Sequence, residues 1–90
     1  MNTYKAPLAD IRFVLFDVLQ SEQSFARLGF HDANRELVDA ILEESARFTE
    51  TVIAPLNHTG DEDGCTLDVQ TGKVTTPPGF KEAYAQFAEN

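Results

Sequence analysis

The chain has 90 residues and a formal net charge of −8, which allow at most one small acidic domain. That charge argues against nucleic acid and anionic membranes as partners, because both attract clustered Lys and Arg. The longest apolar run, residues 13–16, is too short to insert in a membrane, and residues 1–10 lack the apolar core of a signal peptide. The single cysteine cannot form an internal disulfide, which fits a reducing cytoplasm.

A first helix is predicted over residues 8–20. Pro7 suits the start of this helix, where its missing N–H would be unpaired in any case. Apolar residues then recur at the helical spacing i, i+3, i+4 and i+7, at Ile11, Val14, Leu15, Val18 and Leu19. Phe13 and Phe16 lie off this stripe, so the helix is apolar on two faces and needs cover on both.

Two further helices are predicted over residues 22–28 and 35–54. Ser21 and Asn34 are suitable N-caps, and Gly29 suits the position just after a helix. The longer helix has one apolar stripe, made of Leu37, Val38, Ile41, Leu42, Ala46, Phe48, Val52 and Ile53. Most of its charged residues lie away from that stripe, and Glu43 and Arg47 have the spacing of an i, i+4 ion pair. Pro55 is expected to end the helix.

The pattern changes after Cys65. Leu67 and Val69 alternate with polar residues, and Thr71-Gly72 offers a two-residue turn, so a β-hairpin is predicted over residues 66–76. A final helix is predicted over residues 79–89. The expected fold is therefore mainly α, a small bundle of three to four helices with one short hairpin, in a single unit that spans residues 1–90.

The acidic stretch between the long helix and the hairpin invites comparison with a calcium loop. If Gly64 takes the place of the glycine of an EF-hand, Asp61 and Asp63 fall on ligand positions. However, Thr59 then stands at the first ligand position and Gln70 at the last, where a bidentate Glu is needed. We therefore predict a turn, with Gly60 and Gly64 reversing the chain and the acids in solvent.

Neither a transition-metal site nor a catalytic thiol is expected in this stretch. His58, Asp61, Asp63 and Cys65 match no common spacing of transition-metal ligands, so no metal site is predicted. The acids around Cys65 would disfavour its thiolate, which argues against a Cys65–His58 nucleophile–base pair. His31, before the long helix, is expected to be a surface or capping residue.

Four segments in this order resemble the start of bacterial acyl-CoA dehydrogenases: "YKAPLADIRFVLFDVL", "ILEESARFTETVIAPLN", "GDEDGCTL" and "GKVTTPPGFKEAYAQF". The resemblance covers essentially the whole chain. It is greatest to the branch of longer enzymes typified by 3-methylmercaptopropionyl-CoA dehydrogenase. It implies that the chain is part of the N-terminal helical domain of such an enzyme.

The resemblance also implies an activity for the whole enzyme. Acyl-CoA dehydrogenases use FAD to oxidise an acyl-CoA thioester to a trans-2-enoyl-CoA, with a Glu carboxylate as the base and an electron-transfer flavoprotein as the electron acceptor. They are usually homo-oligomers. Further partners of the chain would be the remaining domains of the same enzyme.

No catalytic, cofactor-binding or metal-binding residue is assigned to the chain. In the family, the catalytic Glu and most flavin contacts belong to other domains, so the 90-residue chain alone is expected to be inactive and to bind no FAD. Glu43, Glu44 and Glu50 lie on the polar face of the predicted long helix and are poor candidates for a buried base. The alternative is a free-standing helical module without catalysis, whose excess apolar surface mediates interaction or dimerisation.

Overall fold

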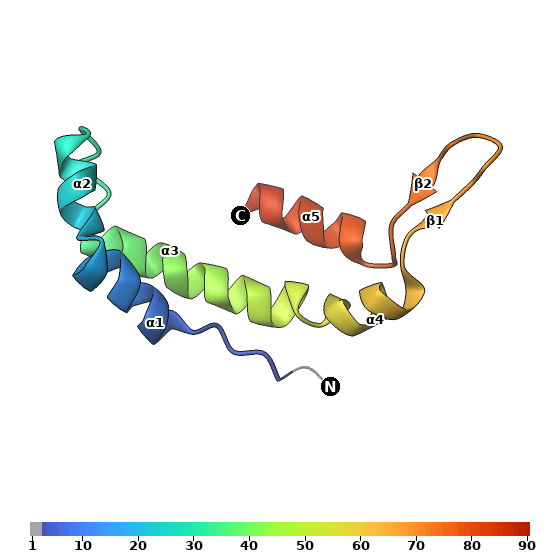
Figure 1. Ribbon diagram of the computed structural model, residues 1–90, viewed down its shortest axis with the longest axis horizontal. Helices are drawn as coiled ribbons and strands as arrows, with labels where there is room; N and C mark the ends of the chain where they lie inside the picture. Colours follow the sequence, from blue (N-terminus) through green and yellow to red (C-terminus); the bar gives the residue numbers. More distant parts are fainter. Residues whose placement is uncertain (1–2) are drawn as a thin grey trace. The chain divides into compact units, whose positions relative to one another are not determined.

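The computed structural model describes residues 3–90, which form two compact units. One unit is Lys5–Thr49, and the other consists largely of Glu50–Asn90. The described residues form five α-helices, two π-helical segments and one antiparallel hairpin (Figure 1). The predicted fold class, mainly α with one short hairpin, is confirmed.

In the first unit, the predicted helix over residues 8–20 changes its register partway along. It begins as α1 (Leu8–Arg12) and continues as the π-helical segment η1 (Phe13–Val18). The last bond of η1 joins the N–H of Leu19 to the carbonyl of Val14, five residues back, at 2.9 Å. Gln20 then adopts a left-handed backbone with φ of 49°, so α2 (Ser21–Arg27) starts as a separate helix.

The longest helix of this unit is α3 (Arg35–Phe48), which lies beside α1 (Figure 1). The predicted cap is confirmed, because Oδ1 of Asn34 accepts a hydrogen bond from the N–H of Leu37 at 2.9 Å. A second π-helical segment, η2 (Thr49–Ile53), follows directly in the chain. The predicted end of helical structure before Pro55 is therefore correct, although the register again changes on the way.

The segment after Pro55 corrects the sequence-based expectation. We predicted a turn, but residues Leu56–Asp63 form the helix α4. Pro55 has φ of −60° and ψ of −20°, so it both ends the preceding segment and starts the next helix, since a proline at a helix start loses no hydrogen bond. Gly60 lies inside α4, and the chain turns only at Gly64, where φ is +62°.

The second unit continues with a hairpin and a helix. Strands β1 (Thr66–Leu67) and β2 (Val74–Thr75) pair with Leu67 opposite Val74. Asp68 organises the connection: its carbonyl accepts from Gly72 at 2.7 Å and its Oδ1 accepts from Gln70 at 3.0 Å. The helix α5 (Phe80–Glu89) then begins within one residue of its predicted start.

Little apolar surface is fully covered in residues 3–90. The buried hydrophobic residues are Ala46, Phe48 and Ala83, and no large side chain is completely buried. Many large apolar side chains are exposed in both units, among them Leu28, Phe30, Val69 and Tyr84. Burial of apolar surface is the main contribution to the stability of a fold, so these residues gain only a small part of the stabilisation that their apolar side chains could give.

Candidate functional site

The acidic stretch occupies α4 and the residues just after it, on the surface of the second unit. His58 lies one turn before Glu62, with Nε2 3.3 Å from Oε1, and both side chains are largely exposed. Asp61 and Asp63 are exposed on the same short helix. An exposed i, i+4 pair of this kind contributes little to stability.

Among the described residues, this geometry brings together neither a set of metal ligands nor the Cys65–His58 pair. Within residues 3–90, no group of three His, Cys, Asp or Glu side chains lies close enough to hold a metal ion. Cys65 is exposed beyond the end of α4. His31 lies exposed in the connection between α2 and α3, where Asn34 provides the cap.

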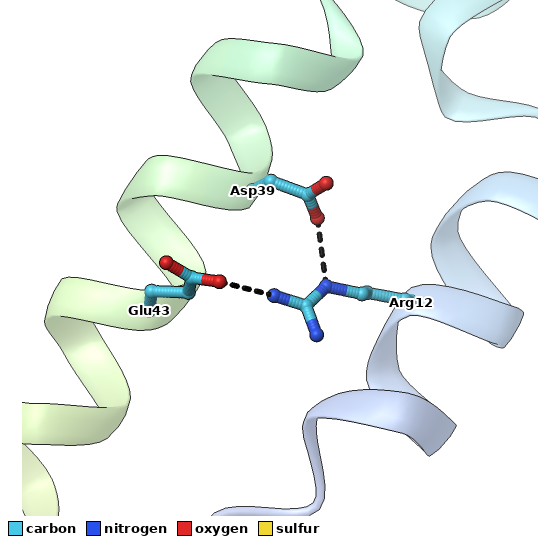
Figure 2. Close-up of polar contacts among 3 residues, drawn as sticks. All are labelled: Arg12, Asp39 and Glu43. Carbon is cyan, nitrogen blue, oxygen red and sulfur yellow. Dashed lines mark hydrogen bonds and ion pairs between the residues drawn. The ribbon is translucent and has the colours of Figure 1, made fainter.

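The most connected polar cluster lies instead in the first unit, where one arginine joins two helices (Figure 2). Nε of Arg12 donates to Oδ1 of Asp39 at 2.8 Å, and Nη2 donates to Oε1 of Glu43 at 3.1 Å. Asp39 and Glu43 are one turn apart on α3, so their carboxylates lie on the same side of that helix. The side chains of Arg12 and Asp39 are only about one-third exposed, at 28% and 35%.

The chemistry of this cluster is that of a structural contact. The hydrogen bond to Asp39 raises the pKa of Arg12, and the negative charges of Asp39 and Glu43 act in the same direction. Two of the guanidinium nitrogens of Arg12 are therefore already engaged by carboxylates of its own unit. The cluster can fix α1 against α3, and it does not resemble a general base aimed at a substrate.

Two further contacts hold the first unit together around the start of α3. The guanidinium of Arg35 lies over the ring of Phe16, 4.4 Å from its centre, which is a favourable cation–π distance. The backbone N–H of Arg35 donates to Oε2 of Glu22, on α2, at 3.1 Å. One residue of α3 therefore contacts both η1 and α2.

The predicted ion pair between Glu43 and Arg47 is wrong. Glu43 pairs with Arg12, while Arg47 pairs with Glu44, whose hydrogen bond is the main cause of a raised pKa of Arg47. Both partner changes follow from geometry. Glu43 faces α1, where a cation is already held by Asp39, and Arg47 reaches the carboxylate three residues before it instead.

Sequence reasoning missed the role of Arg12. A pattern in the sequence could have indicated it: Arg12 is a cation between the apolar Ile11 and Phe13, in a helical stretch whose other charged residues are the acids Asp10 and Asp17. On α3, Asp39 and Glu43 have the i, i+4 spacing that presents two carboxylates to one cation. The two observations can be joined only once it is known that α1 packs against α3.

The residues that sequence analysis rejected as bases are on the surface or partly covered. The side chains of Glu43 and Glu44 are 70% and 46% exposed, and Glu50 is half-buried in η2.

The described residues include no helix with the length and apolar character needed to cross a bilayer.

Comparison with known proteins supports the resemblance stated from the sequence. The chain is 38% identical over 87 residues, 97% of its length, to 3-methylmercaptopropionyl-CoA dehydrogenase of Ruegeria pomeroyi (strain ATCC 700808 / DSM 15171 / DSS-3). The chain spans only 14% of the length of that relative. No family model and no solved structure matches the chain. The chain is thus homologous to a segment of an acyl-CoA dehydrogenase, and the predicted resemblance is confirmed.

Proposed function

We propose that this chain is the N-terminal helical part, residues 1–90, of a FAD-dependent acyl-CoA dehydrogenase. The observation that carries this proposal is the match to a dehydrogenase over 97% of the chain but only 14% of the relative. The mainly helical fold and the thin core of residues 3–90 are consistent with a part that gains cover from further polypeptide.

In this proposal the whole enzyme oxidises the Cα–Cβ bond of an acyl-CoA thioester, and the chain contributes structure. It packs against the other domains and helps to wall the acyl-chain side of the substrate cleft. The enzyme is a cytoplasmic homo-oligomer that passes electrons to an electron-transfer flavoprotein.

The proposal assigns no FAD-binding residue to this chain, and two observations support this. The dinucleotide carries a pyrophosphate, which needs basic groups or free backbone N–H groups. Arg12 and Arg47 are each engaged by carboxylates, and the chain as a whole carries a net charge of −8. We propose that FAD and the catalytic base belong to the remainder of the enzyme.

The proposal is tested by purifying the protein from the cells that make it. The expected result is a polypeptide several-fold heavier than 90 residues that contains flavin and reduces an electron acceptor when given acyl-CoA. A native polypeptide of about 90 residues without flavin would overturn the proposal.

A second candidate function follows from the exposed apolar side chains of the described residues, which include Val18, Leu28 and Phe30. These would suit a free-standing interaction or dimerisation module. The same purification separates the two candidates, because such a module would be small, colourless and self-associated or bound to a partner.

A further inference from the structure

We draw no further inference here: the strongest candidate, the exposed apolar surface patch along and just after η1 (Phe13, Val14, Val18 and Leu19), carries none because nothing in the structure shows what covers it.

Discussion

Arg12 and Asp39 are 27 residues apart in the sequence, and their side chains meet with Nε 2.8 Å from Oδ1. The same guanidinium reaches Glu43, one turn further along α3 (Figure 2). This fork fixes the position of α1 on α3 through two hydrogen bonds in different directions. A pair of bonds from one rigid guanidinium restricts rotation as well as distance, which a single ion pair does not.

The two carboxylates are expected to differ in importance. Asp39→Asn should lower the melting temperature more than Glu43→Gln, because the Asp39 contact is shorter and its side chain is 35% exposed against 70% for Glu43. Thermal unfolding followed by circular dichroism measures both variants.

An Arg12→Gln background provides the control for this comparison. Once the cation is removed, the two substitutions should have similar and small effects, since each acted through Arg12. If Asp39→Asn destabilises equally with and without Arg12, the fork contributes no coupling between the helices.

The cap of α3 provides a second prediction. Asn34→Ala removes the acceptor of the Leu37 N–H and should destabilise the protein by about 1 kcal/mol. For a domain of this size, that loss corresponds to a decrease of about 4–8 °C in melting temperature. Asn34→Asp keeps an acceptor and adds a negative charge at the helix N-terminus, so it should be neutral or slightly stabilising. Equal losses in both variants would contradict a capping role.

The contact between Gly60 and Phe80 provides a third prediction. A Cβ at position 60 would lie 2.5 Å from Cζ of Phe80 and 2.8 Å from its Cε1, so the ring would have to move. Alanine is better than glycine inside a helix by about 1 kcal/mol, but overpacking costs about 1–3 kcal/mol. Gly60→Ala should therefore lower the free energy of unfolding in denaturant.

The sign of this effect should depend on the ring. In a Phe80→Leu background the shorter side chain leaves room for the Cβ, and Gly60→Ala should then stabilise the protein by up to about 1 kcal/mol. A loss of the same size in both backgrounds would show that the backbone of α4, and not the contact with Phe80, requires glycine at this position.

The acidic stretch provides a fourth prediction, which concerns metals. Addition of calcium or zinc should leave the melting temperature unchanged, because the described residues contain no cluster of three metal-binding side chains. A ligand that binds the folded state raises stability in proportion to the logarithm of its concentration above its dissociation constant. A melting temperature that rises with metal concentration, and returns when a chelator is added, would contradict this expectation. A Cys65→Ser variant controls for metal binding by the exposed thiol.

Several elements were predictable because they depend on neighbours in the sequence. Helix starts at Asn34 and near Gly79, the end before Pro55 and the presence of a hairpin all follow from capping, proline and turn chemistry within a few residues. The predicted two-residue turn at Thr71-Gly72 is wrong, because Leu67 pairs with Val74 and the connection between them is longer. The resemblance to acyl-CoA dehydrogenases was likewise carried by local segments in a fixed order, and it was confirmed over nearly the whole chain.

The helix α4 was missed because two local rules competed. Pro55, two glycines and a run of acids are typical of a turn, yet a proline is also well suited to begin a helix. Gly60 is a poor helix former, but it permits the ring of Phe80 to approach the backbone of α4. Phe80 is 20 positions away in the sequence, so no local pattern indicates this contact.

The sequence by itself therefore determined most of the helical segments (though not α4), where most of them end and which enzyme family they resemble, since these depend on short-range spacing. Tertiary structure alone decided that Arg12 joins Asp39 and Glu43, that Phe16 is covered by Arg35 and that Phe13 is not. The physical reason is that side-chain partners are set by which faces meet in space. In η1 that facing depends on one extra residue per turn, which hydrophobic periodicity does not reveal.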